Sequence, residues 1–207
     1  MKTLLRIDTS SRVAGSHSRM LADYFEGLWM RDHPEGKVIN RDLVKQQVPH
    51  IPNRTIEGFY TPKENVTSAT LQATALSDEL ISELKSADEL LISSPLYNLN
   101  IPSNLKAYID HVTRIGHTFG INENGYYGLL TNKKAYVITV KGGIYRGTIM
   151  EQFDFQEPYL YAILGQMGIK VEKLFSLEGT SDEKVRAENQ KEIYKSIDEI
   201  FNHNENE

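Results

Sequence analysis

Short apolar runs alternate along this chain with segments whose apolar residues recur every three or four positions. The runs are typical of buried strands, and the periodic segments are typical of helices that bury one face. Five strands are predicted in this way, at residues 4–8, 38–43, 89–94, 135–140 and 169–175. Helical periodicity follows each strand, with apolar faces that contain Leu21, Leu80, Leu105, Leu160 and Ile197. Strands that alternate with helices predict an α/β fold with a doubly wound parallel sheet.

Prolines and capping residues mark the boundaries of these elements. Three prolines and a glycine within residues 48–68 predict a long irregular loop. Pro102 is expected in the first turn of the third helix. The segment Thr180–Glu183 is predicted to form a capping box before the last helix. We find no linker or repeat, so residues 1–207 are expected to form a single domain, with a frayed polar tail at 202–207.

The composition is that of an ordinary globular protein. The 207 residues are 40% hydrophobic and 25% charged, and the net charge of −5 gives no electrostatic reason to expect nucleic acid or an anionic membrane as a partner. The chain contains no cysteine, and its six histidines are scattered, so we expect no disulfide, no thiolate catalysis and no metal site. Arg6 and Asp8 interrupt the apolar N-terminal run, which argues against a signal peptide. No run is long enough to span a membrane, so a cytoplasmic location is expected.

The loop after the first strand is rich in hydroxyl groups. Residues 8–18 include Ser10, Ser16 and Ser18 and lead into a predicted helix, whose free amides and dipole favour an anion. A Gly-x-Gly-x-x-Gly fingerprint for dinucleotides is absent. We interpret this loop as a site for a monophosphate group, although helix capping alone also favours serine at such a place.

Two further loops follow the third and fourth strands. The loop after the third strand, residues 94–102, offers backbone groups to the polar edge of a planar ring, with Leu96 and Tyr97 beside its face. After the fourth strand, Gly142 and Gly143 allow close approach of a ligand, and Lys141 adds a positive charge. Each loop taken alone is equally compatible with an ordinary turn. Ligands of doubly wound sheets bind at this edge, so the three loops together predict a site for flavin mononucleotide, FMN.

These residues resemble the FMN-dependent NADH-azoreductases, also described as FMN-dependent NADH:quinone oxidoreductases. The resemblance runs from the first strand to the last helix, and its most specific motif is the loop at 94–102. Further matches lie at residues 10–18, 76–81, 116–119 and 141–144. The resemblance implies a flavodoxin-like three-layer sandwich, with a five-stranded parallel sheet of order 2-1-3-4-5 and helices on both faces. It also implies a homodimer with each site near the interface.

The resemblance assigns the contacts of one tightly bound FMN per subunit. The expected phosphate contacts are Ser10, Ser16, His17 and Ser18. The expected ring contacts are Pro95, Leu96, Tyr97, Asn98, Leu99, Val140, Lys141, Gly142 and Gly143.

The chain departs from the family on the side that would meet the substrate. Family members often have Met at Leu96, Phe at Leu99, and Ser-Arg at Val140-Lys141. They also place aromatic residues where this chain has Ile121 and Ile163. The implied substrate slot of Phe119, Ile121 and Ile163, closed by residues 48–68, is therefore thinner in aromatic residues. This difference is expected to alter substrate preference rather than flavin binding.

The implied activity is two-electron reduction of quinones and azo compounds, with NADH as donor and ping-pong hydride transfer through the flavin. NADPH remains open as a donor. Tyr97 and Lys141 are candidate catalytic residues, with Lys141 expected to stabilise the reduced ring or to meet the substrate. Three histidines are candidates for proton delivery, although surface or structural roles compete for each of them: His17, His111 and His117.

Two other classes of protein remain compatible with the pattern. A flavodoxin-like electron carrier would share the flavin site, but its chain is usually shorter and more acidic. An FMN-free α/β module that binds a phosphorylated metabolite would need the serine loop but not the loops at 94–102 and 140–143.

Overall fold

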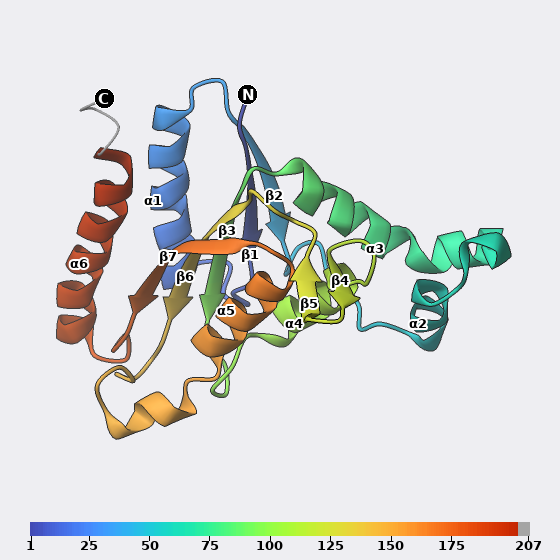
Figure 1. Ribbon diagram of the computed structural model, residues 1–207. Helices are drawn as coiled ribbons and strands as arrows, with labels where there is room; N and C mark the ends of the chain where they lie inside the picture. Colours follow the sequence, from blue (N-terminus) through green and yellow to red (C-terminus); the bar gives the residue numbers. More distant parts are fainter. Residues whose placement is uncertain (203–207) are drawn as a thin grey trace.

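The computed structural model describes residues 1–202 and forms an α/β sandwich around one parallel sheet (Figure 1). The five strands of this sheet stand in the order β2-β1-β3-β6-β7, which is the predicted order 2-1-3-4-5 counted along the parallel strands. Their bounds are β1 Thr3–Asp8, β2 Lys37–Asp42, β3 Glu89–Pro95, β6 Lys134–Val140 and β7 Lys170–Leu177. All four pairings are parallel, so the carboxyl ends of the strands meet at one edge.

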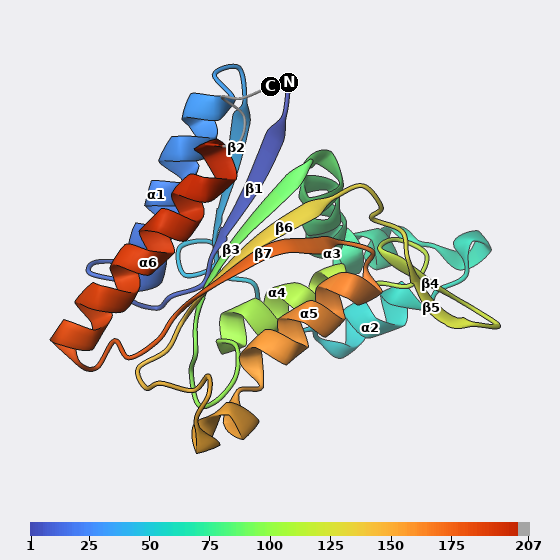
Figure 2. The ribbon, with the colours of Figure 1, turned by 60° about the vertical axis from the view of Figure 1, so that its left-hand side comes forward.

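Within residues 1–202, six α-helices accompany the sheet, and five of them directly follow its strands. Their bounds are α1 His17–Asp32, α2 Asn53–Phe59, α3 Ser68–Ser86, α4 Ser103–Val112, α5 Gln156–Gln166 and α6 Glu183–Asn202. Helices α1 and α6 cover one face of the sheet, and α3, α4 and α5 cover the other, as Figure 2 shows. The predicted flavodoxin-like sandwich is therefore confirmed.

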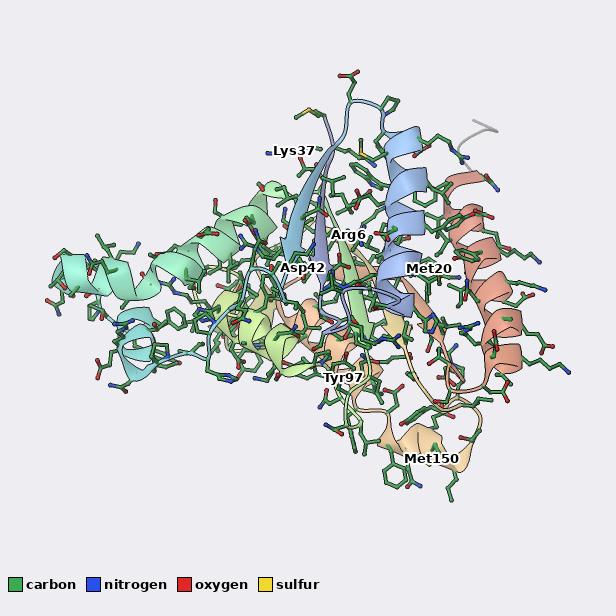
Figure 3. The ribbon with its side chains drawn as sticks, turned by 180° about the vertical axis from the view of Figure 1, so that it is seen from behind. Arg6, Met20, Lys37, Asp42, Tyr97 and Met150 are labelled. Atoms are coloured by element: carbon green, nitrogen blue, oxygen red, sulfur yellow. The ribbon has the colours of Figure 1, made fainter. Side chains whose placement is uncertain are left out.

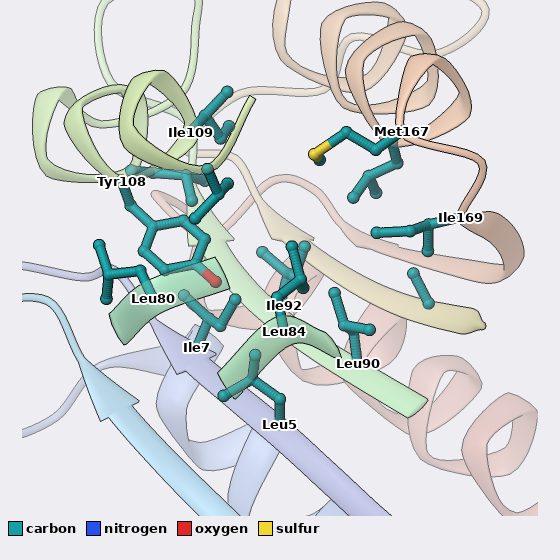
Figure 4. Packing of buried hydrophobic residues seen from close by; sticks show 14 of the residues in the cluster. Leu5, Ile7, Leu80, Leu84, Leu90, Ile92, Tyr108, Ile109, Met167 and Ile169 are labelled. Carbon is teal, nitrogen blue, oxygen red and sulfur yellow. The ribbon is translucent and has the colours of Figure 1, made fainter. Parts of the chain in front are cut away.

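The alternation of side chains along each strand separates two cores. Leu5 and Ile7 of β1 point toward α3 and α4, whereas Leu4 points toward α1. The core beneath α3, α4 and α5 is aliphatic apart from Tyr108 and Met167 (Figure 4). The opposite core is aromatic, because Phe25 packs against the rings of Tyr136, Phe175 and Phe201. Both cores fix the strands whose ends carry the loops.

The segment 48–68 differs from the predicted loop. It contains α2 and a 3₁₀ turn at Lys63–Asn65, and Thr55 donates from its hydroxyl to the carbonyl of Ala73 in α3 at 2.8 Å. The helix escaped prediction because its seven residues are too few to show a clear apolar period.

A two-stranded antiparallel hairpin was not predicted at all. It joins β4 Phe119–Asn122 to β5 Gly125–Gly128 and lies outside the main sheet. Gly128 packs directly on Gly168, where a Cβ on Gly128 would lie 2.1 Å from the Gly168 nitrogen. These four-residue strands rest on backbone contact between glycines, so they leave no hydrophobic pattern to find.

Two predicted caps also differ in detail. Pro102 precedes α4 as its N-cap rather than lying in its first turn. The last helix begins at Glu183, and the carboxylate of Asp182 accepts from the amides of Lys184 and Val185 at 2.9 and 3.0 Å. Thr180 instead donates to the carbonyl of Lys141, so Thr180–Glu183 is not a capping box. The predicted frayed tail begins at Asn202, the last helical residue, and otherwise lies outside the described residues.

Replacement of Asp182 by Ala is expected to lower the free energy of unfolding by about 1 kcal/mol, because two helix amides lose their acceptor. Glu183→Ala should change it by only a few tenths of a kcal/mol, since the exposed Glu183 carboxylate does not close a box. Urea denaturation of both variants measures the difference. A larger loss of stability for Glu183→Ala than for Asp182→Ala would indicate that Thr180–Glu183 does form a capping box.

Candidate functional site

The three predicted loops meet in one cleft at the carboxyl edge of the sheet. The cleft has a volume of about 160 Å³, and its walls come from the ends of β1, β3 and β6 with one residue that follows β7. The lining residues are Ser10, Arg12, Ser16, His17, Ser18, Pro95, Leu96, Tyr97, Val140, Gly142 and Thr180. Figure 3 shows Tyr97 at this edge, beyond the carboxyl end of β3. The juxtaposition expected from sequence is thus present in the fold.

The serine loop presents donors at the start of α1. Ser16 is the N-cap, and its hydroxyl lies 3.2 Å from the hydroxyl of Ser18. Both serines are buried, and Ser10 is buried beside them. The amides of His17 and Ser18 lie in the first turn, where no intrahelical acceptor exists for them. Hydroxyls and free amides at a helix N-terminus form a site suited to a phosphate group.

The side chain of Arg19 links the serine loop to Asp42 at the end of β2. Its guanidinium makes two hydrogen bonds to the Asp42 carboxylate, at 2.7 and 2.9 Å, and a third to the carbonyl of Ser10 at 2.9 Å. The sequence analysis missed Arg19, because a charged residue in the first helical turn looks solvent-exposed, whereas its side chain is only 10% exposed. The Ser10 carbonyl is thereby bound by the guanidinium.

Further contacts join β1 to β3 beneath the same loop. The hydroxyl of Ser93 donates to Asp8 at 2.6 Å, and the hydroxyl of Thr9 donates to the carbonyl of Ser93 at 3.0 Å. Asp8 also pairs with Arg6 at 2.9 Å, and Figure 3 shows Arg6 and Asp42 on neighbouring strands. The polar residues of this strand edge therefore have partners before any ligand binds.

The hydrogen bonds from Arg19 lower the pKa of Asp42 to about 2, against the opposing effect of burial. A carboxyl whose pKa falls on folding stabilises the folded state above its unfolded pKa, and this stabilisation is lost as the pH falls through the folded pKa. We therefore expect Asp42 to contribute to acid destabilisation between about pH 4 and pH 2. Unfolding in urea as a function of pH should show this loss in the unaltered protein and a smaller loss in Asp42→Asn. Parallel pH profiles would contradict the assignment.

The second loop is held in a turn with unusual backbone angles. Asn98 and Leu99 have φ of 48° and 71°, and the backbones of Tyr97 and Asn100 are paired across them. Leucine rarely adopts such angles, and strain of this kind tends to gather at ligand sites. The amide of Leu96 donates to Val140 at 2.8 Å, and the side-chain amide of Gln156 donates to Ser94 and Pro95. The loop is therefore tied to both β6 and α5.

The third loop lines the cleft with Val140 and Gly142 and does not present the charge of Lys141 to it. Val140 and Gly142 line the cleft, but the side chain of Lys141 is turned into the protein and is only 1% exposed. Its ammonium contacts three carboxylates, those of Asp154, Glu157 and Glu178. This placement does not fit the expectation that Lys141 meets a substrate directly.

Not every predicted ring contact faces this cleft. Asn98 lines a second cavity of about 440 Å³, which Tyr97 also lines. Leu99 accepts from the amide of Phe155 through its carbonyl, and the carbonyl of Gly143 accepts from the amide of Gly179. The walls of the second cavity come from the segment before α2, the second loop, α4 and α5; they comprise His50, Tyr97, Asn98, Asn100, Ile101, Ser103, Lys106 and Tyr159. Tyr97 thus lines both hollows.

The residues proposed for the substrate slot are not brought to the cleft within one chain. Phe119 packs edge-on against Tyr126 of the hairpin, with ring centroids 5.6 Å apart. Ile121 is exposed on the same hairpin, and Ile163 packs against the aliphatic core from α5. The structure of one chain therefore leaves this slot a hypothesis.

The three candidate histidines have different surroundings. His17 lies in the cleft, and burial together with Arg186 and Arg12 lowers the pKa of its imidazole. His111 is buried in α4, with a ring nitrogen 3.1 Å from the carbonyl of Pro49, and does not line the cleft. Burial and the nearby Arg114 lower the pKa of His117, which precedes the hairpin. Only His17 is placed beside the three loops.

Two other lining residues were missed by the sequence analysis. Arg12 and Thr180 both line the cleft, Arg12 from the serine loop and Thr180 from the segment after β7. The positive charge of Arg12 within a serine-rich loop was a signal that could have been used. Thr180 had no such signal, because its position depends on the contact between the β6 and β7 loops.

Within residues 1–202 no group of three or more His, Cys, Asp or Glu side chains is arranged to hold a metal ion. In the same range no helix combines the length and apolar character needed to cross a bilayer.

The sheet order and the three-loop cleft define a flavodoxin-like protein, and a family model described as a flavodoxin-like fold matches residues 1–201. The FMN-dependent NADH:quinone oxidoreductase of Xanthobacter autotrophicus is 49% identical over 172 residues, which cover 82% of this chain and 83% of that protein. The enzyme of the same name from Hydrogenovibrio crunogenus is 44% identical over 170 residues, which cover 82% and 84%. This chain belongs to the family of FMN-dependent NADH:quinone oxidoreductases.

Solved structures agree with this assignment. An azoreductase from Bacillus anthracis str. Sterne superimposes with a TM-score of 0.86 at 25% identity and covers 96% of this chain and 100% of its own. An FMN-dependent NADH-azoreductase from Bacillus anthracis str. Ames Ancestor, solved in complex with FMN, gives a TM-score of 0.85 at 25% identity, with 97% and 99% covered. The resemblance predicted from the sequence motifs is thus confirmed.

Proposed function

We propose that this protein is an FMN-dependent oxidoreductase that takes electrons from NADH and passes them to quinones and azo compounds. The observation that carries the proposal is the convergence of three loops on one cleft at the carboxyl edge of the sheet. Relatives that match more than four-fifths of the chain are named FMN-dependent NADH:quinone oxidoreductases, and an azoreductase of the same fold was solved with FMN.

The residues present fit an FMN. The hydroxyls of Ser16 and Ser18, with the first-turn amides of α1, provide donors for a phosphate, and Arg12 adds a positive charge at the cleft. Gly142 allows a planar ring to approach the backbone, and Leu96 and Tyr97 line the same cleft with side chains that suit the face of such a ring. We assign the phosphate to Ser10 and Ser16–Ser18, and the ring to residues 95–99 and 140–143.

When bound, FMN accepts a hydride from NADH and delivers two electrons to an acceptor. The protein binds and orients it. Tyr97 lines both hollows and would pack against the ring face, and backbone groups of the second and third loops would bind its polar edge. Burial together with Arg186 and Arg12 lowers the pKa of His17, and an N–H of its imidazole can donate a hydrogen bond to the phosphate.

The assembly and the location remain part of the proposal. We propose a homodimer in the cytoplasm, in which the hairpin residues Phe119 and Ile121 of one chain help to form the substrate slot beside the cleft of the other. Several large apolar side chains are exposed on the hairpin, including Tyr126 and Tyr127, which supports a covered surface there. Sedimentation analysis that finds only monomers would contradict the dimer.

Steady-state kinetics test the proposed activity. The rate should depend on NADH and on a quinone such as menadione with parallel double-reciprocal lines, because donor and acceptor use the same flavin in turn. A panel of quinones, one azo dye and both nicotinamide nucleotides defines the preference for each. Flavin that is reduced by a ferredoxin-type donor and never by NADH would favour the electron carrier. Failure to take up FMN would favour the phosphorylated-metabolite module.

A further inference from the structure

A buried ammonium group lies directly behind the third loop. Lys141 Nζ is 2.5 Å from Asp154 Oδ2, 2.7 Å from Glu157 Oε1 and 3.0 Å from Glu178 Oε1. The carboxylates come from the residues around the start of α5 and from the residue that follows β7. We call these four residues the Lys141 cluster. Its ammonium is so buried that it can contact neither cofactor nor substrate in the cleft.

The cluster continues into the backbone of the loop. The second oxygen of Glu178 accepts from the amides of Tyr145 and Arg146, at 2.7 and 3.0 Å. Asp154 accepts from the amides of Gln156 and Glu157 and so caps α5. The ammonium therefore joins the carboxylate that shapes the loop to the two that fix the start of α5.

Main-chain hydrogen bonds from the residues after Glu178 also hold the loop. The carbonyls of residues 141–143 accept from the amides of Thr180, Ser181 and Gly179, at 3.1, 3.1 and 2.9 Å. The segment is thus fixed both by these main-chain bonds and by the Lys141 cluster. Val140 and Gly142, which line the cleft, are the chain neighbours of Lys141.

The charges of the cluster do not balance. One ammonium faces three carboxylates, and burial opposes its charge, yet Asp154, Glu157 and Glu178 together raise the pKa of Lys141. Arg146 also approaches the cluster, and its guanidinium lies 3.4 Å from Glu157 but is 68% exposed to solvent. An excess of negative charge therefore lies behind the wall of the cleft, where its field is weakly screened.

We infer that Lys141 is a positioning residue and that the Lys141 cluster sets both the shape of the third loop and a negative field at the cofactor. This inference rests on the proposed function for its second half only. A negative field opposes the uptake of electrons by a bound flavin, so the cluster lowers the reduction potential, whereas the lysine partly offsets that effect. This role differs from the one expected from the sequence, in which the ammonium of Lys141 would stabilise the reduced ring by direct contact.

Two substitutions separate shape from charge. Lys141→Met removes the cation and leaves three buried carboxylates without their partner. Glu178→Gln removes one negative charge but keeps a side-chain oxygen that can accept from the amides of Tyr145 and Arg146. Lys170→Met is the matched control, because Lys170 pairs with Glu172 on an exposed part of β7.

The first measurement is amide hydrogen exchange of the full chain freed of FMN. Lys141→Met should accelerate exchange at Tyr145, Arg146 and residues 179–181 by about tenfold or more, while Glu178→Gln and Lys170→Met stay within about threefold of the unaltered protein. Unchanged protection in Lys141→Met would overturn the positioning role. Because this readout involves no flavin, it stands apart from the proposed function.

The second measurement is the reduction potential of bound FMN. Glu178→Gln should raise it, and Lys141→Met should lower it, with Lys170→Met unchanged. Shifts of opposite sign in the reduction potential are expected from the change of charge in the two variants and not from a loss of packing. Shifts of the same sign, or no shift in Glu178→Gln, would overturn the electrostatic role. If Lys141→Met does not fold, Glu178→Gln alone still decides this point; if the unaltered protein binds no FMN, the proposed function itself fails.

Discussion

Replacing both Ser16 and Ser18 by Ala is expected to raise the dissociation constant of FMN by about 100-fold or more. Each hydroxyl is assigned a hydrogen bond to a phosphate oxygen, and hydrogen bonds to charged groups contribute about 1.5–3 kcal/mol each. Two of them correspond to at least about 3 kcal/mol, which is roughly two powers of ten in affinity. Titration of the flavin-free protein with FMN, followed by quenching of flavin fluorescence, measures the change.

The matched controls separate binding from folding. Ser16 also caps α1, so its loss is expected to cost about 1 kcal/mol of helix stability. Ser18→Ala leaves the cap in place and should still weaken FMN binding about tenfold or more. Ser11 lies in the same loop but is exposed, so Ser11→Ala should bind FMN normally. An unchanged affinity for FMN in the double variant would contradict the assignment of the phosphate to this loop.

The second large effect is expected at Arg19. Arg19→Met leaves the carboxylate of Asp42 without its bidentate partner, and breaking a buried ion pair typically lowers the free energy of unfolding by about 3–5 kcal/mol. The same change frees the Ser10 carbonyl, so we expect FMN binding to weaken about tenfold or more. Urea denaturation and FMN titration measure the two effects.

Arg41 offers a control of equal burial. Its side chain is 9% exposed, against 10% for Arg19, and it pairs with Glu79 and Glu83 of α3 instead of with the serine loop. Arg41→Met should therefore lose a comparable amount of stability and keep its affinity for FMN. If both variants lose FMN equally, the effect of Arg19 is general destabilisation and not support of the loop.

The sequence was sufficient for the sheet and for the principal loops of the site. Buried strands such as 89–94 and 135–140 are apolar because both of their faces are covered, so their pattern is strong. Parallel strands bring their carboxyl ends to one edge, which is why Ser16, Tyr97 and Gly142 could be placed together before any coordinates were known.

Features that depend on tertiary contact could not be predicted. The hairpin at 119–128 depends on the approach of Gly128 to Gly168, about 40 residues away, and leaves no local pattern. The burial of Lys141 depends on carboxylates brought in by α5 and β7, whereas a lysine beside two glycines is ordinarily solvated. Its expected contact with the ligand was inferred from position along the chain alone, and only the fold shows where the side chain points.

The most direct test of the account is an anaerobic titration of the purified protein with NADH. We predict a yellow protein that contains one FMN per chain, whose visible absorbance bleaches with about one equivalent of NADH and returns on addition of a quinone. The Ser16→Ala, Ser18→Ala variant should lose the colour on dialysis. A protein that remains colourless after incubation with FMN, or whose flavin is unaffected by NADH, would contradict the central claim.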